Sequence, residues 1–214
     1  MNTLQAGFAR VNVTPMLGIG LAGYQIRRNA DGVLDELEIN CLAVACGDNK
    51  AVLIAIDHCG IVKSVLNPMR QQICDVTGLP WEAVYIHATH THTAPFLNPN
   101  PTDPLEIEYA QTVKRKFADA AVLALADLKP AKMGYGIGDA PNIAFVRRFR
   151  MKDGSVRTNP GVDNPDILHP IGDVDERVNV LRFDRESDSL VLVNFGNHPD
   201  VVGGCKISAD WPGF

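Results

Sequence analysis

Three histidines follow apolar segments at spacings that suit a metal site. His90 and His92 stand two residues apart at the end of the segment Ala83–His92. Because side chains alternate between the two faces of a strand, histidines at positions i and i+2 lie on the same face and can bind one ion. His198 follows a second apolar segment, Leu190–Phe195, and would supply a third imidazole. Catalytic zinc has three protein ligands and an open position for water, so this pattern predicts a zinc site.

Several polar residues have both a structural and a functional interpretation. His90 and His92 could also be polar residues at the point where a strand meets solvent. Asp57, at the end of another apolar segment, could orient a ligating histidine or complete a turn. Arg147, like the arginine after it, could bind a carboxylate or stabilise an oxyanion, or lie solvated on a hairpin. Asp210 could cap a helix or contact the site.

The other histidines and the cysteines are expected to lie outside the site. His87 points to the opposite face of its strand, and His169 lies in a loop, where a surface position is expected. The five cysteines are scattered and form no CxxC pair, so we expect buried free thiols rather than disulfides or metal ligands. Free thiols suit a cytoplasmic location, and the first five residues show no signal-peptide pattern.

The first half of the chain predicts a sheet with one helix. Leu37–Cys46 and Ala51–Ile56 should pair as a hairpin. The second strand lacks alternation, so we expect it to be buried on both faces in the middle of a sheet. A helical stripe from Val62 to Val76 predicts a helix that Gly78 ends. Gly18–Gly20 is typical of a turn rather than a phosphate loop.

The second half predicts a long helix followed by strands. Asp103 as the cap, Pro104 in the first turn and Glu106 at the capping-box position start this helix, which Lys129-Pro130 ends. Beyond a loop over 158–175, two hairpins are expected, with the strands Arg148–Met151, Val156–Thr158, Val178–Phe183 and Leu190–Phe195. The order favours an α/β fold that leans toward α+β, with a mixed sheet layered with helices and the metal site at the carboxyl ends of strands.

Length, composition and charge exclude several classes of protein. The 214 residues, 46% hydrophobic and 21% charged, are typical of one globular domain or part of a larger one. A net charge of -5 and the short basic cluster Arg147–Arg150 argue against nucleic-acid binding. No apolar stretch reaches the roughly 20 residues that cross a bilayer. No Gly-x-Ser-x-Gly elbow is present, which argues against a serine hydrolase.

Four segments together resemble the neutral/alkaline (non-lysosomal) ceramidases and their bacterial relatives. Ala88–Pro95 resembles the family's ATHTHSGP segment, although Thr93 and Ala94 replace its serine and glycine. The other matches follow in the family's order and are Gly7–Pro15, Arg147–Gly154, and Asn197–Pro199 with Ser208–Gly213. The resemblance implies that residues 1–214 form the N-terminal part of a single ceramidase-like catalytic domain.

The resemblance also implies a function. One zinc ion would be bound by His90 and His198, and the family completes its site with a glutamate and a tyrosine from further downstream. His92 would lie beside the metal and bind substrate or relay protons, and Arg147 would hold a substrate oxygen. The expected reaction is hydrolysis of an amide bond (N-acyl, ceramide-like) or an ester bond by metal-activated water, on a small-molecule amide or lipid-like substrate in sphingolipid metabolism.

Two other functions fit the same residues. A non-catalytic binding domain could keep His90 and His198 as a metal staple, with a closed four-ligand site instead of an open one. A metal hydrolase acting on a polar, sugar-like substrate would have a polar pocket instead of an apolar one.

Overall fold

The computed structural model of the chain describes residues 3–211. The contacts divide the chain into two compact units, the first formed by Met1–Met133, Phe183–Leu190 and Pro199–Phe214, the second by Gly134–Arg182 and Val191–His198. Pro212 and Gly213, the end of the last segment that carries the ceramidase resemblance, lie outside the described residues.

A mixed sheet forms the frame of the first unit. Its strands there include β1 (Leu4–Asn12), β5 (Glu38–Cys46), β6 (Asn49–Ile56) and β7 (Val84–Ala88). The pairs β1–β5 and β5–β6 are antiparallel, which confirms the predicted hairpin, whereas β6 and β7 are parallel. With β8 (Lys129–Asp139), β12 (Arg177–Arg185) and β13 (Ser189–Phe195), the complete strand order is β13-β12-β8-β1-β5-β6-β7.

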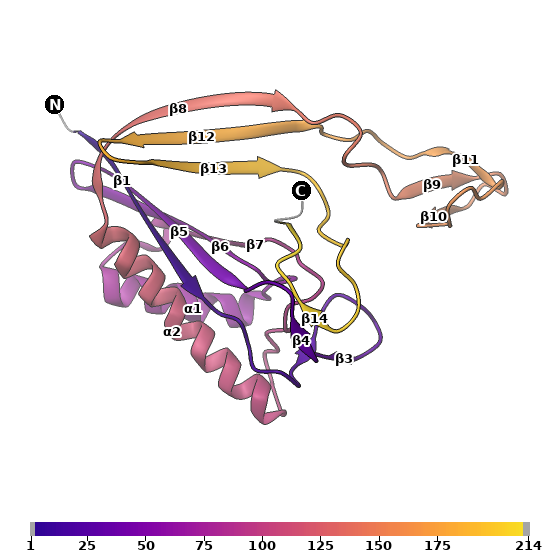
Figure 1. Cartoon of the computed structure of the whole chain (residues 1–214), viewed down its shortest axis with the longest axis horizontal. Helices are drawn as coiled ribbons and strands as arrows, with labels where there is room; N and C mark the ends of the chain where they lie inside the picture. The colour runs from indigo at the N-terminus through magenta and orange to yellow at the C-terminus, as the bar shows by residue number, and fades with distance from the viewer. Residues whose placement is uncertain (1–2, 212–214) are drawn as a thin grey trace. The chain divides into compact units, whose positions relative to one another are not determined.

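Two helices cover one face of this frame (Figure 1). Helix α1 (Lys63–Thr77) and the short turn η1 (Trp81–Ala83) form the crossover that a parallel β6–β7 pair requires. Gly78 ends α1 in the left-handed conformation, as predicted, with φ 73°. Helix α2 (Pro104–Ala126) begins at Asp103, whose side chain accepts a hydrogen bond of 2.9 Å from the Leu105 amide. Neither helix has the length and apolar character that would let it span a membrane.

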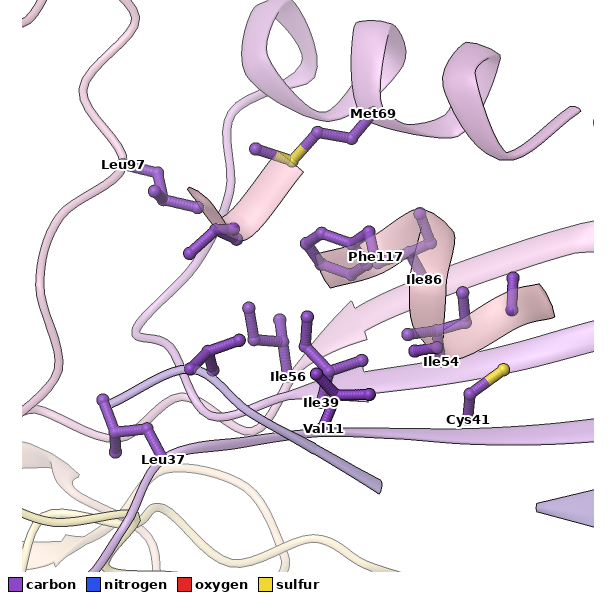
Figure 2. Packing of buried hydrophobic residues seen from close by; sticks show 14 of the residues in the cluster. Val11, Leu37, Ile39, Cys41, Ile54, Ile56, Met69, Ile86, Leu97 and Phe117 are labelled. Atoms are coloured by element: carbon purple, nitrogen blue, oxygen red, sulfur yellow. The ribbon is translucent and has the colours of Figure 1, made fainter. Parts of the chain in front are cut away.

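The apolar core lies between these helices and the sheet. Figure 2 shows Met69 of α1 and Phe117 of α2 in one cluster with Ile54 of β6 and Ile86 of β7. Phe117 is fully buried, and burial of a side chain of this size contributes about 3 kcal/mol to the free energy of unfolding. Cys41 on β5 is fully buried as well, and burial raises the pKa of its thiol to about 12.

The expectation that β6 is buried on both faces is wrong. Val52, Ile54 and Ile56 are buried, but Leu53 and Ala55 between them are only half-buried. The helices of the first unit therefore cover one face of the strand, and the apolar residues on its other face are only half-buried.

Short strands order the loops at the carboxyl end of β6 and β7. β2 (Gly20–Leu21) pairs with β3 (Arg28–Asn29), so residues 22–27 form the loop of a small hairpin. β4 (Gly32–Val33) pairs in parallel with β14 (Lys206–Ile207) and joins the segment before β5 to the end of the described chain.

The second unit consists of strands. β9 (Arg148–Met151) and β10 (Val156–Thr158) form the predicted hairpin around Asp153-Gly154. The predicted loop over 158–175 contains a further strand, β11 (Ile167–Pro170), which pairs with β9. β8 was not expected from the sequence, because the glycines between Met133, Tyr135 and Ile137 are atypical of a strand interior. From Lys132 onward its side chains are exposed up to its last residue.

Candidate functional site

The carboxyl ends of β6 and β7 bring three potential metal ligands together. Because these two strands are parallel, the segments that follow Ile56 and Ala88 leave the same edge of the sheet. Cys59 follows the first strand, and His90 and His92 follow the second. Both histidines therefore lie past the carboxyl end of a strand, where the sequence analysis expected a metal site.

The strand itself ends earlier than predicted. β7 stops at Ala88, and His90 has a positive φ of 77°, which an extended strand does not allow. His90 is exposed and His92 is buried, so the alternation argument for a common face was wrong. The two imidazoles nevertheless lie close together, with ring centroids 5.1 Å apart and planes at 80°.

Backbone hydrogen bonds explain this departure from the strand. The Thr89 amide donates to the Ile56 carbonyl at 2.9 Å, and the His90 amide donates to the His58 carbonyl at 2.8 Å. The chain after β7 thus follows the turn after β6 instead of continuing straight. Both histidines are held by the same loop that carries Cys59.

Asp57 secures this loop instead of orienting a histidine. Its carboxylate accepts hydrogen bonds from the Glu38 amide at 2.9 Å, the Thr89 hydroxyl at 3.1 Å and the Trp211 indole at 2.7 Å. Burial raises the pKa of Asp57, although these three donors act in the opposite direction. Of the two interpretations left open by the sequence, the contacts support the structural one.

The segment Thr91–Thr93 is tied to the last described part of the chain. The hydroxyls of Thr91 and Thr93 donate to the Ser208 carbonyl at 2.7 and 3.0 Å. Asp210, buried and at φ 64°, accepts from the amides of Val201 and Val202 at 2.9 and 3.1 Å. Asp210 thus orders the loop before β14, and the residues that a helix cap at Asp210 would serve lie mostly outside the described chain.

His90 has the orientation expected of a metal ligand. Its Nδ1 is within hydrogen-bonding distance of the Cys59 backbone carbonyl, which can only accept, so Nδ1 carries the proton. The lone pair is then on Nε2. Metal-binding histidines commonly donate their other ring N–H to a carbonyl or carboxylate in this way.

His92 contacts a carboxylate that the sequence analysis had not singled out. Its Nδ1 lies 3.2 Å from Oδ1 of Asp200, and the same oxygen accepts a short hydrogen bond from the Tyr24 hydroxyl. The Tyr24 ring meets the His92 ring edge to face at 5.3 Å. The hydrogen bond to Asp200 and burial raise the pKa of Tyr24. No local sequence signal links Tyr24 or Asp200 to His92.

The three ligand atoms suit a cation such as zinc. Cys59, His90 and His92 each offer one ligand atom, and these atoms lie within 4.8 Å of one another. Sulfur and imidazole nitrogen are the donors that zinc prefers. The prediction of free thiols is confirmed, but the sequence analysis did not place Cys59 beside the two histidines. Its position just after β6 and Asp57 was the signal for this.

The remaining predicted residues lie on other surfaces or in the second unit. His87 is exposed on β7, and His169 is exposed on β11, in agreement with the sequence. Arg147 precedes β9 with an exposed side chain, and its carbonyl accepts from the Asn159 amide at 2.9 Å. His198 ends the second unit. The roles of Arg147 and His198 stay predictions from the resemblance.

The architecture matches a known class of structure. No protein-family model and no curated protein sequence matches this chain. Among solved structures, the fold is similar to that of neutral ceramidase from Pseudomonas aeruginosa, with a TM-score of 0.73 and 17% sequence identity over 98% of this chain. It is also similar to a ceramidase complexed with C2, with a TM-score of 0.70 and 18% identity over 98% of this chain.

These likenesses establish the fold. The expected ceramidase-like architecture, a mixed sheet with helices, is confirmed. The chain spans about a third of the ceramidase structures, 34% of each. At 17–18% identity the similarity concerns the fold, and the reaction must be argued from the site itself.

Proposed function

We propose that this chain carries the histidine cluster of a metal-dependent hydrolase that cleaves an amide or ester bond. The observation that supports it most directly is that His90, with its Nδ1 at the Cys59 carbonyl, lies beside His92 where two parallel strands end. The ceramidase-like fold supports an N-acyl amide or another lipid-like molecule as the substrate.

In this proposal His90 binds the metal through Nε2, because its Nδ1 faces the Cys59 carbonyl. His198 is the second ligand implied by the resemblance, and zinc is the preferred ion for such donors. When bound, zinc would polarise a substrate carbonyl and lower the pKa of a water molecule toward about 7.

The other side chains have separate tasks. His92 would take up and release a proton at Nε2, the ring nitrogen opposite its contact with Asp200. Arg147 would donate hydrogen bonds to a substrate oxygen that gains negative charge during the reaction. Neither residue is required to bind the metal in this scheme, so metal content and turnover can be separated experimentally.

The test compares His90→Ala with His87→Ala, a matched change in an exposed histidine on the same chain segment. Zinc content by elemental analysis and hydrolysis of N-acyl amides are measured for both variants. We expect His90→Ala to lose zinc and at least about 100-fold in turnover, as loss of a metal ligand removes the polarising ion. His87→Ala should keep both. Full turnover in His90→Ala would refute the proposal.

A metal staple without catalysis is the second candidate, and the proximity of the Cys59 thiol favours it. Structural zinc sites are rich in cysteine and closed by four protein ligands. Cobalt substitution separates the two candidates. A spectrum that responds to added anions indicates an open position and supports the hydrolase, whereas an unresponsive tetrahedral spectrum supports the staple.

A further inference from the structure

Four residues from two segments that are distant in the sequence contact His92. Gly23, Tyr24 and Arg28 belong to the β2–β3 hairpin, and Asp200 belongs to the loop before β14. A Cβ atom at Gly23 would lie 2.5 Å from Cβ of His92, and Gly23 has a φ of 96°. The hairpin can thus approach His92 this closely only with glycine at that position.

Asp200 lies beside Nδ1 of His92, whereas the proposed proton transfer takes place at Nε2. Oδ1 of Asp200 lies 3.2 Å from Nδ1 of His92, within ion-pair distance but not in hydrogen-bond geometry. An ionised carboxylate at this distance stabilises a proton electrostatically and has none to donate, so it favours a proton on Nδ1. The tautomer of a neutral imidazole is set by the bond that one nitrogen makes, which leaves the lone pair on the other. Nε2 then becomes the nitrogen that can accept a proton or bind a cation.

Tyr24 and Arg28 hold this arrangement in place. The Tyr24 hydroxyl donates to the same Asp200 oxygen that faces His92. The Arg28 guanidinium lies 4.1 Å from the centre of the Tyr24 ring and donates to the carbonyls of Ala22 and His92 at 2.6 and 2.7 Å. It also donates to the Gly204 carbonyl, beyond Asp200 in the same loop. One side chain thus ties the three segments that meet at His92.

We infer that Asp200, held by Tyr24, is a positioning residue that fixes His92 in the tautomer with the proton on Nδ1 and so directs Nε2 toward the substrate. The catalytic consequence rests on the proposed hydrolase function, but the tautomer does not. Tyr24 acts through Asp200, since its hydroxyl contacts the carboxylate and its ring contacts the imidazole.

The direct test is nitrogen NMR on the metal-free chain with 15N-labelled histidine. A His92→Gln sample assigns the His92 signals by difference. The expected result is a neutral ring with its proton on Nδ1. A wild-type ring with the proton on Nε2 overturns the inference without the need for any variant.

Variants then test the role of Asp200. Asp200→Ala removes the acceptor and should let His92 populate both tautomers. Asp200→Asn keeps an oxygen acceptor and should largely restore the proton on Nδ1. Asp48→Ala, an exposed aspartate in the β5–β6 turn, is the control and should leave the signals unchanged. An Asp200→Ala spectrum identical to that of the wild type would contradict the inference.

Kinetics connect the tautomer to function. Loss of a residue that orients a working histidine costs roughly 10- to 100-fold in activity, so kcat of Asp200→Ala should fall by that factor with little change in KM. If the tautomer behaves as expected but His90→Ala leaves turnover intact, the hydrolase proposal fails and the positioning inference stands. If His90→Ala abolishes turnover but Asp200→Ala leaves the tautomer unchanged, the positioning inference fails and the hydrolase proposal stands.

Discussion

One histidine–tyrosine pair of the first unit lies in the core, and another lies in the candidate site. In the core, Nε2 of His58 is 2.9 Å from the Tyr109 hydroxyl, which itself donates to the Val13 carbonyl at 2.8 Å. In the site, Tyr24 meets His92 through ring contact and shares Asp200 with it.

The difference is the carboxylate. His58 is fully buried without an acidic hydrogen-bond partner, and burial lowers its pKa to about 4. It is a neutral packing group whose polar atoms join strand ends to α2. His92 is almost as buried but faces Asp200. Burial without a carboxylate keeps His58 neutral and in a packing role. A carboxylate beside one ring nitrogen of His92 favours the proton there and leaves the other nitrogen able to accept a proton.

The largest expected effect concerns the titration of His58. Because its pKa is about 4 in the folded chain and about 6.5 when unfolded, the unfolded state binds a proton first as the pH falls. Above pH 6.5 the titration of His58 has no effect on the free energy of unfolding. Between pH 6.5 and 4 it lowers the free energy of unfolding, by at most about 3 kcal/mol in total. Urea unfolding across this window measures it.

His58→Gln is the control for that measurement. It should flatten the dependence between pH 6.5 and 4, while Asp57, whose pKa burial raises, is present in both proteins. An unchanged slope in His58→Gln would show that other groups govern the acid sensitivity.

Tyr109→Phe is expected to have the next largest effect. Removal of the buried hydroxyl leaves the Val13 carbonyl and the His58 N–H without their hydrogen bonds, which costs about 2 kcal/mol in the free energy of unfolding. Tyr85→Phe, on an exposed ring, should be neutral. Zinc affinity should not change in either variant. A change in affinity for Tyr109→Phe alone would mean that the core pair is coupled to the site.

Gly23→Ala tests the close approach in the site. The added methyl group and the positive φ should cost about 1 to 2 kcal/mol and displace His92. Gly60→Ala is the matched control, because a Cβ there meets no atom within 4 Å. Unfolding midpoints and the His92 NMR signals give the readout. Equal effects of the two changes would argue against a tight fit at Gly23.

Tyr24→Phe should have the smallest effect on stability. The ring keeps its contacts with His92 and Arg28, and only the half-exposed hydroxyl is lost, so less than about 1 kcal/mol is expected in thermal unfolding. A loss as large as that of Tyr109→Phe would remove the distinction between the two pairs.

Elements with strong local signals could be predicted from the sequence. Asp103-Pro104 gave the start of α2, Gly78 the end of α1, and Asp153-Gly154 the β9–β10 turn, since capping and turn geometry depend on adjacent residues. The convergence of His90 and His92 was also anticipated, although through a strand that in fact ends at Ala88.

Features that depend on distant contacts could not be predicted. β8 is a different case, because its sequence alternates Met133, Tyr135 and Ile137 with glycines. Glycine is disfavoured inside strands, so this alternation was not taken as a strand. The positive φ of His90 follows from hydrogen bonds to the turn after β6. Tyr24 and Asp200 are separated by 176 residues, and only the folded loops show that they share an oxygen with His92.

The reaction rate of the buried Cys41 thiol can be used to measure how often the sheet opens at β5. Its high pKa and full burial leave almost no accessible thiolate in the folded chain, whereas Cys46, at the end of the same strand, is exposed. An alkylating reagent should therefore modify Cys46 at once and Cys41 only when β5 separates from its neighbours. The ratio of the two labelling rates then measures the fraction of molecules in which the sheet is open at β5.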